Sequence, residues 1–186
     1  MTFRAFISID VQPSEQMSNF HQALKETNAQ VKLVDLENTH LTLKFLGNTS
    51  ENHVPEIVNI MEGSIEGMAP FSISFKATGA FPSLNHMKVV WIGVQNTDGM
   101  RSISDFLNDE LTVLGYKKEK RRFSPHLTLG RVKGGRNKEQ LAQVISSWKD
   151  EDFGEMEVAN IRLKKSVLSP QGPTYSIVHE AKIRSP

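Results

Sequence analysis

One tetrapeptide occurs twice in this chain of 186 residues, as His40–Leu43 and as His126–Leu129. Leu-Thr-Leu favours a β-strand, and neither copy contains a helix cap or a helix breaker. Side chains alternate between the two faces of a strand, so the His and Thr of each copy should share one face and the two Leu the other. The Leu face can enter a core, which leaves each strand presenting an imidazole and a hydroxyl to a cleft.

Two such strands facing each other would bring together His40, Thr42, His126 and Thr128. Histidine titrates near neutral pH, so one ring can serve as a general base and the other as a general acid. The Thr hydroxyls can donate hydrogen bonds to a charged oxygen. This set suits attack of water at phosphorus with a departing alcohol. A duplicated structural strand would explain the repeated Leu residues, but it does not explain the repeated His and Thr.

The composition is that of an ordinary soluble globular protein, with 38% hydrophobic and 23% charged residues. No segment approaches the roughly 18 apolar residues of a membrane span. The chain starts with a strand-like run over residues 2–9, which lacks the features of a signal peptide. There is no Cys, which excludes disulfides, thiolate chemistry and Cys-type zinc sites. We therefore expect a cytoplasmic protein that does not enter a membrane.

The net charge of +1 conceals an uneven distribution along the chain. Between Lys117 and Lys138 there are nine Lys or Arg residues and a single acid, Glu119, so the remainder of the chain is net negative. A run of like charges is usually a solvated face. Here the run surrounds His126, which favours a polyanionic substrate such as RNA.

Hydrophobic periodicity predicts an alternation of strands and helices. The expected strands cover residues 3–9, 31–34, the two motifs, 71–77, 87–94, 155–168 and 174–183. The expected helices cover residues 13–28, a segment ending near 66 after a break and cap at 47–50, 99–114, and 137–148. Four further histidines are assigned no catalytic role: His21, His53, His86 and His179. Of these, His86 could lie at the edge of a cleft.

The order of elements repeats in the two halves of the chain. A shift of 86 residues places Phe3 on Val89 and His40 on His126. We predict an α+β fold in a single bilobal domain, with the internal repeat covering roughly residues 1–86 and 87–186. In this fold, mostly antiparallel sheets of two pseudo-two-fold related lobes line a central cleft, and the helices lie outside.

The runs His40–Gly47 and Pro125–Val132 resemble the motifs of the 2H phosphoesterase superfamily. Within it, the chain is most similar to the RNA 2′,3′-cyclic phosphodiesterases once called 2′-5′ RNA ligases (LigT-like), and residues 4–7 and 168–170 add to the similarity. The resemblance implies a bilobal fold with the two motifs on facing strands. It also implies hydrolysis of a terminal 2′,3′-cyclic phosphate to a 2′-phosphomonoester, without a metal ion or any other cofactor.

The resemblance further implies a role for each motif residue. His40 would donate a proton to the departing 3′ oxygen, and His126 would activate water as the base. Thr42 and Thr128 would hold the non-bridging oxygens, and Arg131 would meet the substrate phosphate. The implied partner is RNA with a cyclic phosphate end, tRNA fragments being one candidate, and the protein is expected to be a monomer.

Several alternatives remain open from the sequence. The substrate could be a small cyclic or 2′-5′ nucleotide, or the chain could be an RNA-binding module without turnover. A metallohydrolase using His40 and His126 is disfavoured, because neither motif has the nearby carboxylate and third ligand of such sites. The chain has no Walker-type loop, so any ligation would be the reversal of cleavage, joining a cyclic phosphate to a 5′-hydroxyl without ATP.

Overall fold

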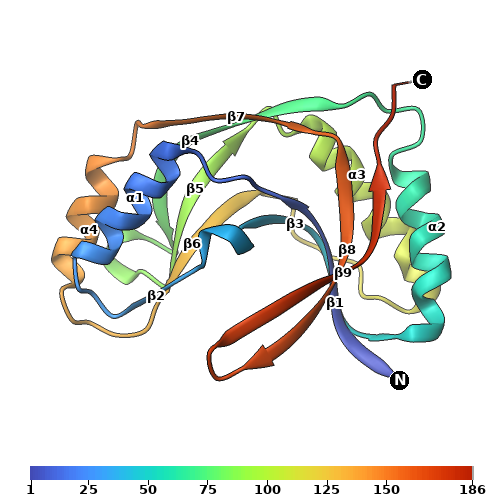
Figure 1. Ribbon diagram of the computed structural model, residues 1–186, viewed down its shortest axis with the longest axis horizontal. Coiled ribbons are helices and arrows are strands. Elements are labelled where there is room, and N and C mark those ends of the chain that lie inside the picture. The colour runs from blue at the N-terminus through green and yellow to red at the C-terminus, as the bar shows by residue number, and fades with distance from the viewer. Residues whose placement is uncertain (186) are drawn as a thin grey trace.

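The computed structural model describes residues 1–185, which form two antiparallel sheets covered by four α-helices (Figure 1). Sheet A has four strands, in the spatial order β3 (His40–Ser50), β1 (Thr2–Asp10), β8 (Asn160–Ser169) and β9 (Gly172–Lys182). Sheet B has five, in the order β2 (Val31–Leu33), β6 (His126–Val132), β5 (Val89–Gln95), β4 (Phe71–Phe81) and β7 (Asp152–Val158). All neighbouring strands are antiparallel.

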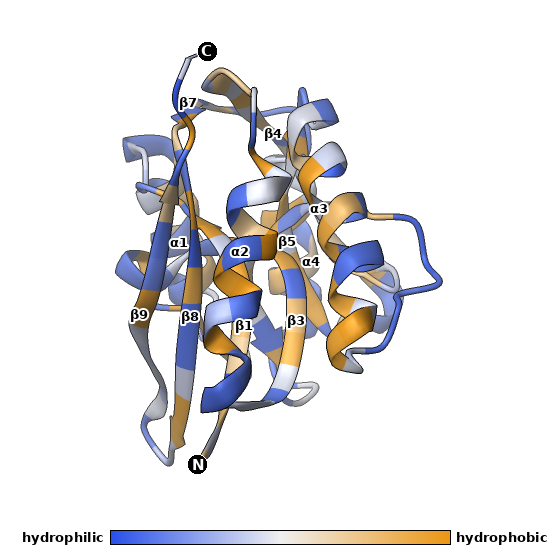
Figure 2. Ribbon diagram, turned by 90° about the vertical axis from the view of Figure 1, so that its right-hand side faces the viewer, coloured by the Kyte–Doolittle hydropathy of each residue, from blue (hydrophilic) through white to orange (hydrophobic). Residues whose placement is uncertain are grey.

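Each sheet has its helices on one face. Helices α2 (Val54–Ser64) and α3 (Asp98–Glu110) pack on sheet A, as Figure 2 shows in front of β1 and β3. Helices α1 (Glu15–Glu26) and α4 (Lys138–Ser147) pack on sheet B. The opposite face of each sheet, which carries no helix, is called its open face below. The predicted α+β class, with two antiparallel lobes and external helices, is confirmed.

The helix boundaries follow from local side-chain chemistry. The Ser14 hydroxyl accepts a hydrogen bond from the Met17 amide, 3.2 Å away, and so caps α1. Pro13 therefore precedes the cap, and the prediction that it stands in the first turn was wrong. The apolar stripe of α1, through Phe20 and Leu24, is completely buried as its spacing predicted. After α3, a 3₁₀ turn over Leu111–Leu114 ends at Gly115, whose φ of 82° gives the expected left-handed cap.

The segment predicted as one strand over residues 155–168 is two strands in different sheets. β7 ends at Val158 beside β4, and β8 begins at Asn160 beside β1, so the chain crosses from sheet B to sheet A at Ala159. Periodicity within one segment cannot reveal such a change of partner. As a result, each sheet draws its strands from both halves of the chain, and the repeat boundary near residue 86 is not a boundary between sheets.

The break expected at residues 47–50 belongs to a strand, and a second glycine, Gly79, also lies within a strand. β3 continues through Gly47 to Ser50, where the Ser50 hydroxyl caps a short 3₁₀ turn before α2. Gly47 has a φ of 69°, so it bends the strand without ending it. β4 likewise continues through Gly79. A side chain at this position would collide with the indole of Trp91, since a Cβ would lie 2.3 Å from it. Both glycines are therefore strand residues and do not mark loops.

Core packing dominates the stability of each lobe, which leads to a first prediction. Ile7 in β1 is completely buried, whereas Ile177 in β9 is 53% exposed. Ile7→Ala should lower the free energy of unfolding by about 2–5 kcal/mol, because it removes buried methyl groups and leaves a cavity. The matched change Ile177→Ala should cost less than about 0.5 kcal/mol. Urea denaturation of both variants measures the difference, and equal losses would contradict this assignment of the core.

Candidate active site

Each motif strand contains a β-bulge at the same place. In sheet A, Ile7 pairs with Lys44 and the next residue, Ser8, pairs with Thr42, so Leu43 has no opposite residue. Two residues then oppose one, and the alternation of faces changes phase. A regular strand would place Lys44 beside Thr42 on the open face. The bulge instead turns Lys44 into the core, where it is 3% exposed, and brings Phe45 to the open face.

The second motif strand repeats this irregularity. Val90 pairs with Gly130 and Trp91 pairs with Thr128, so Leu129 is the residue without a partner. The change of phase brings Arg131 to the open face of sheet B, where it is exposed. Each motif therefore presents three side chains on one open face, with His40, Thr42 and Phe45 on sheet A and His126, Thr128 and Arg131 on sheet B.

The pairing also corrects the alignment of the two halves. Phe6 pairs with Phe45, and Val89 pairs with Arg131, so Phe6 and Val89 hold equivalent positions. The predicted match of Phe3 with Val89 was therefore wrong by three residues. The motif strands are related by a shift of 86 residues, whereas the strands beside them are related by a shift of 83. A single sequence shift cannot capture both, because the connections between the strands differ in length.

Both motif histidines are oriented in the same way by the backbone. The Nδ1–H of His40 donates to the Asn38 carbonyl at 2.9 Å, and the Nδ1–H of His126 donates to the Ser124 carbonyl at 3.1 Å. A carbonyl can only accept, so each ring must hold its Nδ1 proton. The Nε2 of each ring is then left to accept a proton when the imidazole is neutral, or to donate one when it is charged.

The two rings are held in place by aromatic neighbours. The ring of His40 contacts Phe6, with centroids 4.9 Å apart, and Tyr175, which meets it edge-on at 5.3 Å. The ring of His126 meets Phe81 edge-on at 4.9 Å, and Phe81 packs in turn against Trp91. Such contacts restrict the rotation of the imidazoles, which is what a preorganised acid and base require.

The environment of His40 disfavours its charged form. Burial lowers the pKa of His40 below 6.5, and the positive charge of Lys164 lowers it further. The hydrogen bond to the Asn38 carbonyl and the negative charge of Asp10 oppose this change without overcoming it. In the free protein, His40 is therefore neutral at pH 7.

Beneath His40, a group of charged side chains on the open face of sheet A is paired internally. Asp10, the register partner of His40, accepts from both Arg162 and Lys164, and Arg162 also donates to Glu180 at 2.7 Å. Lys164 is 6% exposed, so its ammonium depends on Asp10 for compensation. The two cations and two carboxylates of this charge network balance one another. A hollow of about 470 Å³ opens beside it, lined among others by Asp10, Gln12, Asn160 and Arg162.

Tyr175 connects the two open faces. Burial raises the pKa of its phenol, and the positive charge of Arg131 partly opposes that effect, so Arg131 of sheet B lies opposite Tyr175 of sheet A. The tip of the β8–β9 hairpin reaches the same region, since a Cβ added to Gly172 would come within 3.8 Å of the Lys32 ammonium. Lys32 is the register partner of Arg131. The cations Lys32 and Arg131 thus stand beside the hairpin that carries Tyr175.

The basic segment that follows α3 is fixed by a buried lysine. The Lys44 ammonium donates to Asn108 Oδ1 at 2.6 Å and to the Lys117 carbonyl at 2.7 Å. Asn108 also accepts from the Glu119 amide at 2.8 Å and donates to the Glu119 carbonyl at 3.1 Å. Burial lowers the pKa of Lys44, and the charge of Glu119 opposes this. These four bonds anchor the segment that leads to His126, and they start from the residue that the first bulge turned inward.

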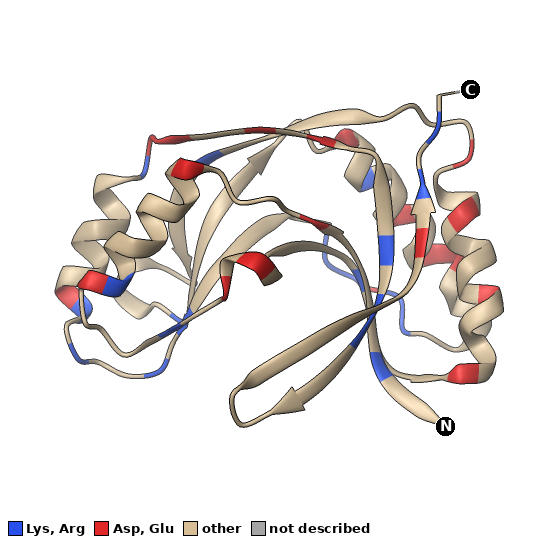
Figure 3. Cartoon of the chain, in the orientation of Figure 1, with Lys and Arg blue, Asp and Glu red and all other residues tan. Residues whose placement is uncertain are grey.

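Cations from the two ends of the basic window lie in different parts of the molecule. Lys117 and Lys118 adjoin α3, where Lys118 pairs with Asp109 at 2.6 Å. Arg136 and Lys138 adjoin the far end of sheet B, where they donate to the carbonyls of Asn28 and Asn85 (Figure 3). The window therefore does not form one patch around His126. Arg131, which belongs to this window, lies on the open face of sheet B beside its register partner Lys32.

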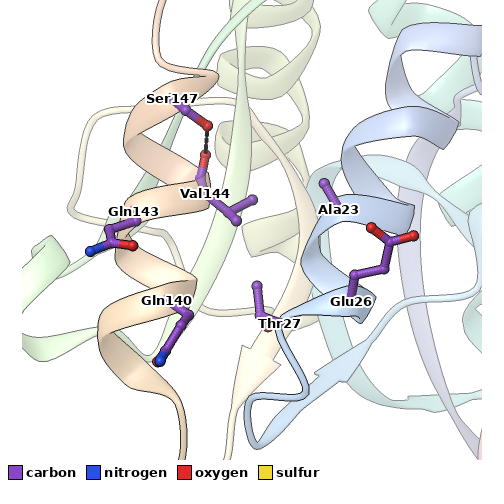
Figure 4. A pocket seen from close by; sticks show the side chains of 7 residues that line it. All are labelled: Ala23, Glu26, Thr27, Gln140, Gln143, Val144 and Ser147. Atoms are coloured by element: carbon purple, nitrogen blue, oxygen red, sulfur yellow. Dashed lines mark hydrogen bonds between the residues drawn. The ribbon is translucent and has the colours of Figure 1, made fainter.

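A larger hollow, of about 520 Å³, lies on the outer side of sheet B. It is formed by α1 and α4, and its lining residues are short or uncharged apart from Glu26 (Figure 4). The histidines project from the opposite face of that sheet or from sheet A, so this hollow is not part of the site. Within residues 1–185, no three His, Asp or Glu side chains gather in a way that could hold a metal ion. None of the helices in this range is long and apolar enough to span a bilayer.

Comparison with known families decides the classification. The family model of the 2′-5′ RNA ligase superfamily matches residues 13–165. The chain belongs to this superfamily. Two curated relatives, both named RNA 2′,3′-cyclic phosphodiesterase, come from Methanocaldococcus jannaschii and Methanothermobacter thermautotrophicus. The first is 40% identical, and the match covers 95% of this chain and 99% of the relative; the second is 38% identical, with 95% and 96% covered.

Solved structures of the superfamily share the fold. TT0787 of Thermus thermophilus has a TM-score of 0.78 at 24% identity, covering 97% of this chain and 98% of the other. E. coli LigT complexed with 3′-AMP has a TM-score of 0.72 at 18% identity, covering 98% and 99%. The predicted resemblance to 2H phosphoesterases of the LigT type is therefore confirmed, and at the level of the superfamily so is the prediction of a hydrolase.

The superfamily motifs did not point to every residue of the open faces. Asp10, Lys164 and Tyr175 adjoin His40 from other strands, and no pattern in the sequence marked them. The remaining histidines lie elsewhere. His21 bonds the Val34 carbonyl, His53 adjoins Tyr116, and His179 pairs with Glu62 of α2 on the helix-covered side of sheet A. His86 is exposed in a short 3₁₀ turn between β4 and β5.

The lowered pKa of His40 predicts a specific pH dependence of stability. The unfolded chain takes up the His40 proton near pH 6.5 and the folded protein only at lower pH, so stability is lost as the pH falls through 6.5. His40→Gln should therefore lose less stability than the unsubstituted protein between about pH 7.5 and 5. Urea denaturation across this range measures the effect. His86→Gln, an exposed control, should match the unsubstituted protein, and identical slopes for all three proteins would contradict the burial of His40.

A third prediction concerns the anchor at Lys44. Lys44→Met leaves the oxygen atoms of Asn108 and Lys117 without their donor, which should cost about 1–3 kcal/mol of stability. Amides of residues 117–122 should exchange faster with deuterium, whereas those of β1 should not change. The control is Lys76→Met, which alters an exposed lysine on β4. Unchanged exchange in residues 117–122 would show that Lys44 does not anchor this segment.

Proposed function

We propose that the protein hydrolyses terminal 2′,3′-cyclic phosphates of RNA to 2′-phosphomonoesters by acid–base catalysis with His40 and His126. The observation that carries the proposal is that the backbone orients both imidazoles in the same way. Each is tied through Nδ1 to the carbonyl two residues before it, which leaves Nε2 free of that bond, and each shares its strand face with a threonine two residues on. The activity named for both curated relatives agrees with it.

The proposed reaction needs an acid and a base on opposite sides of phosphorus. His126 Nε2 removes a proton from the attacking water, and His40 Nε2 gives a proton to the departing 3′ oxygen as the P–O3′ bond breaks. Thr42, Thr128 and Arg131 donate to the non-bridging oxygens, whose charge grows in the transition state. If the 5′-hydroxyl of a second RNA replaces the water, the same step forms a P–O5′ bond, breaks the P–O3′ bond and leaves a 2′-5′ linkage without ATP. His126 would take the proton of the 5′-hydroxyl and His40 would protonate O3′, so ligation is an accompanying capacity of the same residues.

To act as a general acid, His40 must be protonated, so substrate binding must raise its pKa. Burial and Lys164 lower the pKa of the free ring. A phosphodiester anion next to Nε2 would favour the charged ring and raise that pKa. Because activity requires protonated His40, its pKa sets the alkaline limb of the kcat profile, and this limb should lie at higher pH than the pKa of the free ring would give. The profile should be bell-shaped with limbs near neutrality. A flat profile between about pH 5 and 9 would count against a histidine pair.

Substitution of either histidine tests the proposed roles. His40→Ala and His126→Ala should each lower the rate by about 10²–10⁴, because each removes one proton transfer. Steady-state kinetics on a short RNA with a 2′,3′-cyclic phosphate end measures the loss, and His86→Ala serves as the control. Circular dichroism should show both variants folded. Full activity in either motif variant would exclude the two-histidine mechanism.

The products distinguish the proposed function from its alternatives. The same RNA, incubated with the protein in EDTA, should yield a 2′-phosphate end. A 3′-phosphate would retain the histidine pair but reverse the substrate in the site. Turnover lost in EDTA and restored by a metal ion would favour a metallohydrolase. Binding without turnover would favour an RNA-binding module, and turnover of mononucleotide cyclic phosphates alone would favour a small-nucleotide enzyme.

A further inference from the structure

A row of three polar side chains crosses sheet A beyond the motif residues. Arg4 of β1 pairs with Asn48 of β3 on one side and with Ser166 of β8 on the other. The register shifts between β1 and β3 add residues only to β3, so the faces of β1 alternate regularly. Arg4 therefore shares the open face with Ser8, the register partner of Thr42. The three side chains are called the Arg4 row below.

The Arg4 row consists of hydrogen-bond donors that solvent reaches. Arg4 and Asn48 are exposed, and Ser166 is partly exposed. Within residues 1–185, Arg4 forms no ion pair, whereas Arg162 on the same face is held by two carboxylates. A guanidinium, an amide and a hydroxyl can all donate to an anion, and a guanidinium binds phosphate oxygens in pairs. The chemistry of the row therefore suits a phosphate group.

The opposite end of the open faces carries negative charge. Glu155 and Glu157 of β7 line the hollow of about 470 Å³ that opens beside Asp10 (Figure 3). Both glutamates are exposed, and neither pairs with a cation in the part of the chain that the structure describes. Unpaired carboxylates repel a polyanion, so a nucleic acid backbone is disfavoured at this end.

Sheet B adds positive charge at the end where the Arg4 row lies. Tyr175 is the register partner of Ser166 and so continues the row onto β9. Arg131 of sheet B lies opposite Tyr175, and its register partner Lys32 is exposed beside the tip of the same hairpin. The unpaired charge of the open faces therefore changes sign along β1, from positive near Arg4 to negative at the hollow beyond the other end of the strand.

We infer that the Arg4 row binds a phosphodiester on the 5′ side of the terminal nucleotide, and that the RNA leaves the site toward the N-terminal end of β1. The inference rests on the proposed function. Arg4 stands four residues along β1 from Ser8, which corresponds to roughly 13 Å of strand. An extended arginine side chain covers part of that span, so its guanidinium can reach a phosphate one or two nucleotides from the group held at Thr42.

Such a contact has a recognisable signature. Phosphate contacts position an RNA and carry no base sequence, and they make its affinity depend on salt. The Arg4 row therefore predicts a preference for an RNA end over a mononucleotide cyclic phosphate, which has no phosphodiester on its 5′ side. It also predicts a contribution to binding and not to the proton transfers, because the row is remote from both imidazoles.

The test compares three forms of one short RNA that ends in a 2′,3′-cyclic phosphate. One is intact, one has uncharged methylphosphonates at the two linkages nearest the cyclic end, and one has them at the two linkages nearest the 5′ end. Binding is measured by fluorescence anisotropy over a range of salt concentrations, in EDTA, with His126→Ala as the background. The variant is Arg4→Gln. The matched control is Arg184→Gln, an exposed arginine that follows β9 at the opposite end of sheet A.

We expect Arg4→Gln to weaken binding of the intact RNA about three- to tenfold. The slope of log K against log salt should become less steep by about 0.7, the value for one phosphate of a single strand. Methylphosphonates near the cyclic end should weaken binding to the background protein at least as much and should abolish the effect of Arg4→Gln. Methylphosphonates near the 5′ end should leave that effect in place, and Arg184→Gln should behave as the background.

An effect of Arg4→Gln that survives the methylphosphonates near the cyclic end would overturn the inference. So would unchanged binding of the intact RNA, or an equal loss from Arg184→Gln. With His126 intact, Arg4→Gln should raise KM for the RNA and leave kcat unchanged, and a fall in kcat alone would contradict a binding role. Failure of the proposed function would appear separately, as absent turnover of the intact RNA by the unsubstituted protein.

Discussion

The open faces depend on one backbone irregularity that occurs in both motif strands. Without the bulges at Leu43 and Leu129, the residues after each His-x-Thr would take the opposite faces, and Phe45 and Arg131 would point into the helix layers. The bulges also turn Lys44 inward, and its two hydrogen bonds then hold the start of the segment that leads to His126. One feature of strand pairing thus sets the composition of both faces and connects one motif to the approach of the other.

On this nearly symmetric frame, the two histidines differ in their surroundings. His40 is enclosed by Phe6 and Tyr175 and lies near the buried ammonium of Lys164, so its pKa is lowered. His126 meets the ring of Phe81 and lies on the face that carries Arg131. Pairs of titratable groups in unlike environments are what allow one to give a proton while the other takes one. The duplicated frame supplies the geometry, and the surroundings of His40 supply its preference for the neutral form.

The sequence predicted the features that depend on local pattern. The apolar stripes of α1 and α4, the left-handed cap at Gly115 and the strand character of both motifs follow from residue type and spacing. The features set by strand partners could not be read in this way. Examples are the crossing at Ala159, the continuation of β3 through Gly47, and the bulge at Leu43, each of which depends on which strand lies alongside. Lys164 and Tyr175 reach His40 from strands more than 120 residues away, so no local signal could mark them.

The interleaving of the chain explains why such long-range contacts can be maintained. β1 and β3 lie in the same sheet as β8 and β9, and helices α1 and α3 each pack on a sheet other than the one that holds the strand before them. Neither sheet can form from one half of the chain alone. The hairpin that carries Tyr175 toward Arg131 is therefore held by pairing of β8 with β1, the strand beside the first motif. The relative placement of the two motifs therefore depends on the packing of both cores, because each sheet contains strands from both halves of the chain.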